Sequence, residues 1–390
     1  MRKILINPFL MFGLTFLYVF ISFNMGLSDL YLKTNDYSLN LIFACFIVMC
    51  LFLGGVYHLT LLSRNKNLFQ TSQSISKRTF SNSILIVGFI LECANNGGVP
   101  LFLVLKGAVY DYTQFGIKTF HVFYMGYLSA SAIINFERYL LTRSKYYLIA
   151  PLLAVIITIL ILNRGALLLI LFPIALMYIA SLRVKIKIKH FTLIGAMLIA
   201  VIVGFGILGD KRLLSSGYEE ADAILKIGEA SPVFENLPTG FFWVYLYSTS
   251  PFANLMLQAN QGNFNQGDIG DFLATSIYPD FISKYTNPTM DERFSLIKIT
   301  PELNVGTAFC MPLITFGIAG LIMYFAWFLI FNFLFIWLNK NSYLLSTAAT
   351  LTSIAIFLSF NNMLTFSSCV LQIIFITVFS RLRCGRKMVM

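Results

Sequence analysis

Apolar segments of close to 20 residues recur along most of this chain, and they limit its fold more than any other feature. A helix of about 20 apolar residues crosses a hydrocarbon core about 30 Å thick. Within lipid such segments must be helical, because an unpaired backbone N–H or C=O finds no water there. With 58% hydrophobic and 12% charged residues, the composition predicts an all-α polytopic membrane protein and not a soluble domain.

We expect about ten transmembrane helices. They lie at approximately residues 4–23, 38–62, 81–104, 120–140, 146–162, 165–182, 191–209, 308–337, 343–361 and 364–380. The first lacks a small-x-small cleavage site, so we interpret it as a membrane helix and not as a signal peptide. The eighth is long for one crossing, and we expect it to tilt or to begin as a short helix outside the membrane.

Basic residues cluster in alternate loops, and this asymmetry predicts the orientation. With the N-terminus inside, the inward loops hold 18 of the 28 lysines and arginines but only one of the 17 acidic residues, Glu137. The net charge of +11 divides into about +17 inside and −6 elsewhere. We therefore expect both termini to be cytoplasmic, and we attribute the basic balance to topology and not to nucleic-acid binding.

One connection is far longer than the others. Residues 210–307 separate seven N-terminal helices (1–209) from three C-terminal helices (308–390), and the topology places this segment outside. Long loops are usually functional, so we expect an outer lobe. Its apolar part, Gly240–Leu257, predicts an amphipathic or re-entrant helix pair broken near Ser250-Pro251, because the residue before proline avoids the helical region.

The lobe also carries candidate carbohydrate contacts. Trp243, Tyr245 and Tyr247 could stack on sugar faces, although aromatic residues at this depth are also typical of the interfacial belt. Asp268 and Asp271, three residues apart in "GDIGDF", are expected to cap a turn.

Arg164 is the one charge in the apolar stretch from Tyr146 to Ala180, in "ILNRGALL". The topology places it in a short outer turn between the fifth and sixth helices. One interpretation is an interfacial arginine whose charged head extends to water. The other is a functional residue, since charges near membrane depth commonly mark binding sites.

Further cations on the outer side could converge with Arg164. Lys211 and Arg212 follow the seventh helix, and Arg293 precedes the eighth. Guanidinium groups match phosphate oxygens with two parallel hydrogen bonds and stay charged at all relevant pH values. A cluster of them at an outer membrane face predicts binding of a lipid-linked phosphate or pyrophosphate. The alternative for each is a solvated surface charge.

The candidates for a general base are Glu92, His121, Asp291 and Glu292. Glu92 lies in "LECANNGGVPLF", before a Gly-Gly and a proline that should break the helix. Polar groups at a broken helix near the membrane surface commonly line a cavity; the alternative is a carboxylate paired with an outer lysine. His121 opens the fourth helix. It is either a candidate sugar contact or a polar residue that caps the helix at the membrane interface.

Metal-protease, nucleotide-binding and nucleophile-elbow motifs are absent from the sequence, as are paired histidines. The six cysteines show no C-x-x-C spacing. We therefore expect no metal and no cofactor, and neither hydride transfer nor ATP-driven work.

In four strings the chain resembles the bacterial oligosaccharide repeat unit polymerases, the Wzy or O-antigen polymerase family. They are "GGVPLF", "NRG", "YLYSTSPFANL" and "NVGTAFCMPLITFGIAG", in this order along most of the chain. The resemblance implies a GT-C-like glycosyltransferase of the bacterial inner membrane, whose large loop lies in the periplasm. Among the candidate site residues, the resemblance best supports Arg164, which lies in "NRG", and the "SPFAN" segment. In that segment Asn254 is a candidate sugar contact.

The same resemblance implies the reaction and the partners. Such an enzyme joins oligosaccharide repeats carried on undecaprenyl pyrophosphate, and undecaprenyl pyrophosphate leaves. Membrane lipid and a chain-length regulator protein are the further partners implied. On this hypothesis Arg164, Lys211, Arg212 and Arg293 bind the pyrophosphate.

Two other functions stay open at this stage. An O-antigen ligase would use the same donor with a different acceptor. A flippase of lipid-linked saccharides would favour about twelve evenly connected spans with half-length symmetry, which this sequence lacks. A structural or channel protein without chemistry is the remaining alternative.

Overall fold

The computed structural model describes residues 2–62, 82–107, 110, 114–182, 188–215, 217–220, 222–286, 293–340 and 342–384. Within these ranges the chain is helical and forms no strand. The longer helices are α1 (Pro8–Asn24), α3 (Tyr37–Tyr57), α4 (Asn82–Asn95), α6 (Phe120–Thr142), α7 (Ile149–Leu160), α8 (Arg164–Ser181), α9 (Ile188–Ser215), α11 (Thr239–Asn260), α15 (Cys310–Asn339), α16 (Leu344–Phe357) and α17 (Ser367–Cys384). The short helical segments are η1 (Arg2–Ile6), α2 (Asp29–Leu32), η2 (His58–Leu62), α5 (Pro100–Leu105), η5 (Lys145–Leu148), α10 (Ala223–Ile227), η6 (Pro232–Phe234), α12 (Ile269–Phe272), η7 (Leu273–Ile277) and α13 (Asp280–Thr286).

Three stretches of helix in the described residues are long and apolar enough to cross a membrane: Tyr37–Thr60, Arg164–Ser181 and Cys310–Asn339. Five shorter helices are also apolar, among them α1, α4 and α16. Many large apolar side chains point outward, such as Phe52, which is 69% exposed. An outer surface of this kind needs lipid around it, so the fold is that of a helical membrane-embedded protein.

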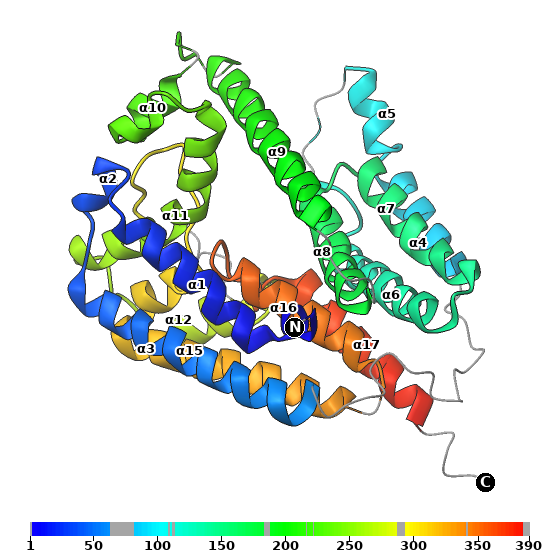
Figure 1. Ribbon diagram of the computed structural model, residues 1–390. Helices are drawn as coiled ribbons and strands as arrows, with labels where there is room; N and C mark the ends of the chain where they lie inside the picture. Colours follow the sequence, from blue (N-terminus) through cyan, green and yellow to red (C-terminus); the bar gives the residue numbers. More distant parts are fainter. Residues whose placement is uncertain are drawn as a thin grey trace.

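The connections between helices gather at two ends of the bundle (Figure 1). At one end, Ser346 N–H donates to Glu137 over 2.9 Å and Ser380 Oγ donates to the Ser342 carbonyl over 3.2 Å. At the other end, Lys33 pairs with Glu229 at 2.9 Å, and Ser28 forms a backbone bridge with Ala230. Each of these contacts joins segments that are far apart in the sequence.

Two apolar clusters hold the bundle together. The larger joins α1, α3, α11, α15 and α16 through phenylalanine contacts, with Phe46 and Phe325 stacked at 4.1 Å. The smaller lies between α4, α6, α7 and α8 and includes Leu85, Phe115 and Ile161. Cys93, Phe115 and Ala166 of this cluster are close in sequence to Glu92, His121 and Arg164, three of the predicted site residues.

The third predicted span is interrupted. α4 ends at Asn95, and Gly97 and Gly98 follow with positive φ angles of 73° and 150° before Pro100 opens α5. The break at the Gly-Gly-Pro sequence is thus confirmed, but the continuous helix over 81–104 is wrong. Within the described residues α4 spans 14 residues, about 21 Å of helix.

The eighth predicted span begins as a short helix, as expected. Phe316 and Gly317 leave the helical conformation, Gly317 with φ of 59°, and divide α15. The carbonyls of Leu313, Ile314 and Thr315, freed by this break, accept the backbone N–H groups of residues 265–267 at 2.8–3.2 Å. A loop of the outer lobe therefore supplies the partners that the helix lost.

The predicted break near Ser250-Pro251 is wrong, because α11 continues through Pro251 as one helix. Pro251 and most of its neighbours are buried, and Thr249 Oγ1 donates to the Tyr245 carbonyl at 2.6 Å. Packing along the whole helix outweighs the hydrogen bond that proline cannot make. The seventh helix also differs from its prediction, since α9 extends to Ser215 and carries Lys211 and Arg212 in its last turns.

Helices α9 and α11 cross at glycines. A Cβ atom on Gly206 would lie 2.4 Å from Gly240 Cα, whereas a Cβ on Gly204 would meet nothing within 4 Å. Small residues at helix crossings let backbones approach closely within membranes.

We therefore expect Gly206→Val to destabilise the protein by about 1–3 kcal/mol, a typical penalty for overpacking. Gly204→Val makes the same change of residue in the same helix without a clash, and should unfold near the temperature of the wild type. The thermal unfolding midpoint of the detergent-solubilised protein, followed by tryptophan fluorescence, checks this. Equal midpoints for the two variants would contradict the close crossing.

Candidate functional site

Glu92 and His121 form a pair where α4 ends and α6 begins. His121 Nδ1 lies 2.8 Å from Glu92 Oε2 and 3.0 Å from Oε1. Glu92 is fully buried, and the side chain of His121 is 20% exposed. Where the carboxylate is ionised it can only accept, so Nδ1 carries the hydrogen, and in the neutral tautomer that fits this geometry Nε2 carries the lone pair. The pair therefore presents a base whose orientation is fixed by a buried carboxylate.

Gly116 closes over this pair. Its φ is +93°, and a Cβ atom there would lie 2.7 Å from His121 Nδ1 and 3.0 Å from Glu92 Oε1. Both the backbone conformation and the space thus demand glycine. Phe115 packs edge-on to the His121 ring at 5.7 Å, so the imidazole is held on two sides.

A chain of contacts leads from His121 to the turn that carries Arg164. The ring of Phe115 meets Tyr110 at 6.3 Å, and Tyr110 Oη donates to the Ile161 carbonyl at 2.8 Å. Ile161 begins the turn between α7 and α8. The structure therefore brings Glu92, His121 and Arg164 to the same end of the smaller apolar cluster.

Arg164 is the first residue of α8 and is exposed. The side chain of Asn163 caps this helix by accepting the Ala166 N–H at 3.0 Å, and Leu162 adopts a positive φ of 61°. A cation at a helix N-terminus is unfavourable for the helix itself, because the macrodipole is positive there. The same placement favours an anion, which both the helix end and the guanidinium attract. Helix stability therefore does not explain Arg164.

Segment α13 of the outer lobe lies against the start of α6. Tyr285 Oη and Thr119 Oγ1 are 2.8 Å apart, and Phe281 packs on Phe123. The neighbours of the bonded residues, Lys118 and Lys284, add two exposed cations to this end of the bundle.

Asp280 anchors α13 to the start of α17. Its Oδ1 accepts the backbone N–H of Ser367 at 2.9 Å and the hydroxyl at 3.1 Å. Burial raises the pKa of the Asp280 carboxyl, and the bonds from Ser367 oppose that effect. Asp280 thus fixes α13, the helix that carries Lys284, next to the start of α6, where the Glu92–His121 pair lies.

Lys211 and Arg212 belong to a different region, where the end of α9 packs on α10 and α11. Between these helices Asp210 accepts the hydroxyl of Thr239 at 2.5 Å and the indole N–H of Trp243 at 2.8 Å. Trp243 is buried, and Tyr247 packs beside it at 5.6 Å. The polar group of Trp243 therefore serves the α9–α11 contact and not a sugar.

Arg293 lies in a third region, beside α12. Its Nη1 donates to Asp271 Oδ1 at 2.9 Å, and its guanidinium lies 4.9 Å from the Phe294 ring. Asp268 and Asp271 form a capping box for α12, which confirms their predicted role in a turn. Asp291 and Glu292 lie outside the described residues.

Two further candidate sugar contacts are buried. Asn254 is fully buried and donates both amide hydrogens, to the carbonyls of Leu303 and Val305 at 2.7 and 2.8 Å. Its Oδ1 accepts the Ile299 N–H at 2.8 Å. Tyr245 is also buried and packs against Phe242. Asn254 thus fixes the loop before α15, and both side chains are buried in the protein.

No protein-family model, no curated protein and no solved structure matches this chain. The function must therefore be inferred from its own residues and their geometry.

Removing one member of the Glu92–His121 pair should cost more than removing both. His121→Ala leaves a buried carboxylate without its partner, a loss of about 3–5 kcal/mol. Glu92→Gln together with His121→Ala removes that uncompensated charge, so the double variant should be more stable than His121→Ala alone. Unfolding midpoints of both single variants and of the double variant measure the coupling, and additive effects would show that the pair is not energetically coupled.

Proposed function

We propose that this protein is a membrane glycosyltransferase that polymerises undecaprenyl-pyrophosphate-linked oligosaccharide repeats, as the O-antigen polymerases do. One observation carries the proposal: a buried carboxylate orients a partly exposed imidazole at the same end of the bundle as Arg164. This arrangement offers a base and a cation at a membrane surface, where a lipid-linked donor and a water-borne sugar can meet. The four matching strings of the sequence support the same reaction class.

The chemistry divides between these residues. A hydroxyl of the acceptor sugar attacks the anomeric carbon of the growing chain, the bond from that carbon to the pyrophosphate oxygen breaks, and the hydroxyl proton passes to Nε2 of His121. Glu92 holds the imidazole and stabilises the imidazolium that forms, as in other carboxylate–imidazole pairs. Arg164 stabilises the negative charge that develops on the departing pyrophosphate. Lys118 and Lys284 add to the positive electrostatic potential near His121.

The arrangement of the loops supports the topology that the reaction needs. The end of α6 contacts the start of α16, and the basic residues Arg138, Arg143, Lys145 and Lys340 lie in or next to these helix ends. On this basis we propose ten crossings of a GT-C-like fold in the bacterial inner membrane, with both termini in the cytoplasm and the 210–307 lobe in the periplasm. A chain-length regulator protein is the partner that the family implies.

A ligase is the closest alternative, because it would use the same donor at the same kind of site and differ in its acceptor. A flippase is less well supported, because the single large lobe makes the two halves unequal, whereas carriers commonly have half-length symmetry. Lys211 and Arg212 in the last turns of α9, and Arg293, which pairs with Asp271, are assigned no chemical role, because they lie in other regions of the fold.

Arg164→Ala should leave expression intact and abolish long-chain polysaccharide, while single repeats persist. Loss of one group that stabilises developing negative charge typically lowers a rate by about 10²–10³-fold. Arg164→Lys should restore part of the product, because lysine keeps the charge without the two-pronged geometry. Gel analysis of surface polysaccharide, in a strain whose own copy is deleted, gives the measurement.

Lys298→Ala is the matched control, because Lys298 is another exposed cation of the outer loops. It should support full-length polymer. The deletion strain itself separates the functions: one repeat on each lipid core indicates a polymerase, and none indicates a ligase or flippase. Full-length polymer from Arg164→Ala would remove Arg164 from the site.

A further inference from the structure

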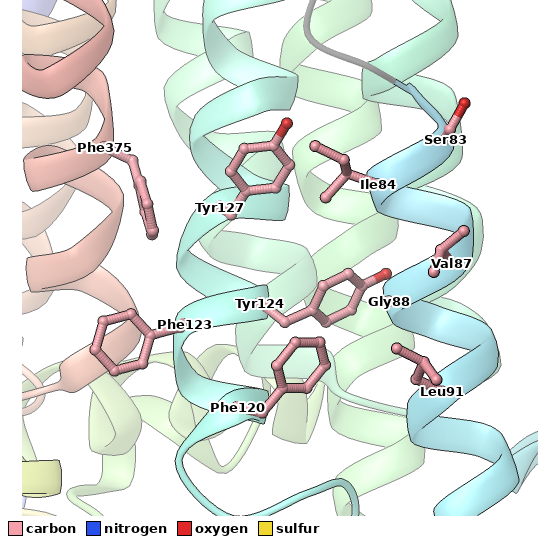
Figure 2. A pocket seen from close by; sticks show the side chains of 10 residues that line it. All are labelled: Ser83, Ile84, Val87, Gly88, Leu91, Phe120, Phe123, Tyr124, Tyr127 and Phe375. Carbon is pink, nitrogen blue, oxygen red and sulfur yellow. The ribbon is translucent and has the colours of Figure 1, made fainter.

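A cavity of about 430 Å³ lies between α4, α6 and α17 (Figure 2). One wall consists of residues between Ser83 and Leu91, the other of four aromatic side chains between Phe120 and Tyr127, and Phe375 closes one side. Ile84 and Val87 in the first wall are 52% and 53% exposed. The cavity is therefore a groove that opens sideways from the bundle, toward the lipid that surrounds these helices.

The floor of the groove is apolar. Gly88 lies under Tyr124, since a Cβ there would be 2.4 Å from the ring. The hydroxyl of Tyr124 donates to the Leu85 carbonyl at 2.6 Å, so its polar group is already satisfied. The accessible surface of the groove therefore consists of aromatic and aliphatic carbon atoms, and such a surface suits a hydrocarbon ligand.

The groove leads to the Glu92–His121 pair. Gly88 precedes Glu92 by one helical turn in α4, and Tyr124 follows His121 by three residues in α6. Residues three and four apart share a helix face, so the floor and the pair occupy the same seam between the two helices. Leu91 and Phe120, the direct neighbours of the pair, line the end of the groove.

We propose that this groove binds the isoprenoid chain of the lipid-linked substrate, with its pyrophosphate at the outer end beside His121 and Arg164; the inference rests on the proposed function. Charge favours this occupant over a bilayer phospholipid. The exposed groups near the outer end include the cations Arg164, Lys118 and Lys284, which match the high negative charge of a diphosphate.

The length of the groove limits what it recognises. From Ser83 to Leu91 a helix rises about 12 Å, so the groove holds only the isoprene units next to the pyrophosphate. The rest of the chain stays in the bilayer. A short isoprenoid diphosphate of 20 carbons should therefore bind as well as the full carrier does.

The test uses full-length protein in nanodiscs and a photoreactive geranylgeranyl diphosphate, without any acceptor sugar. Val87→Trp fills the groove and should lower labelling at least tenfold. Ile90→Trp is the matched control, because Ile90 is 57% exposed on the same helix and does not line the groove. In the wild type, the label should lie on α4 or on the start of α6, and undecaprenyl pyrophosphate should displace it.

A second pair, Ile84→Trp against Ile86→Trp, repeats the comparison at the other end of the groove if Val87→Trp folds poorly. Equal labelling of the groove and control variants would overturn the proposal, as would displacement by phosphatidylglycerol as effective as that by the carrier. Labelling does not depend on turnover. Full-length polymer from Arg164→Ala with intact groove labelling would therefore reject the assigned polymerase site and keep the lipid site.

Discussion

Every backbone group that leaves a helix inside a membrane needs a new partner from the same chain, and this requirement organises the outer half of the protein. α4 stops at Gly97-Gly98, the turn at Leu162 separates α7 from α8, and α15 is divided at Gly317. At Leu162 and Gly317 another segment or a capping side chain supplies the missing bonds, whereas the turn after α4 supplies its own, with Gly98 N–H donating to the Cys93 carbonyl at 2.9 Å. Polar side chains collect where such breaks occur, and the Glu92–His121 pair and Arg164 lie next to two of them.

The geometry of the Glu92–His121 pair is fixed by its surroundings. A carboxylate that is fully buried interacts more strongly with its one partner than it would in water, so it fixes the imidazole that it contacts. Gly116 and Phe115 exclude other positions of the ring. In the proposed function, the apolar groove and the cations near His121 would separate the two halves of an amphipathic substrate, hydrocarbon on one side and phosphate and sugar on the other. A site at the end of a helix seam, where bilayer and water are both within reach, suits such a molecule.

Much of the fold was predictable, because the apolar segments fix where helices lie, and the Gly-Gly-Pro and Asp268–Asp271 patterns fix where two of them break or begin. Pro251 shows where such predictions fail. Proline disfavours a helix interior, but the tertiary packing of α11 outweighs this local preference. The site was predictable only in part. Glu92, His121 and Arg164 stood out as residues, yet the pairing of Glu92 with His121 spans 29 positions and depends on how α4 packs on α6.

The other arginines illustrate the same limit, since a sequence assigns charges to a face of the membrane and not to a place on it. Arg212 belongs to α9 and Arg293 pairs with Asp271 of α12, so neither lies with Arg164 at the start of α8. Gly116 and Lys284 gave no signal, because the first matters only beside a folded pair and the second only through the Thr119–Tyr285 contact.

The backbone ladder between residues 265–267 and the divided α15 has a mechanical consequence. It ties the extramembrane segment to a membrane helix through main-chain bonds, and Asn254 ties the next stretch of loop to α11 in the same way. Displacing one would drag the other, so this part of the lobe cannot swing as a free lid. In the proposed function, a long polymeric product would pass along this tethered rim, and bulky reactants would enter from the side.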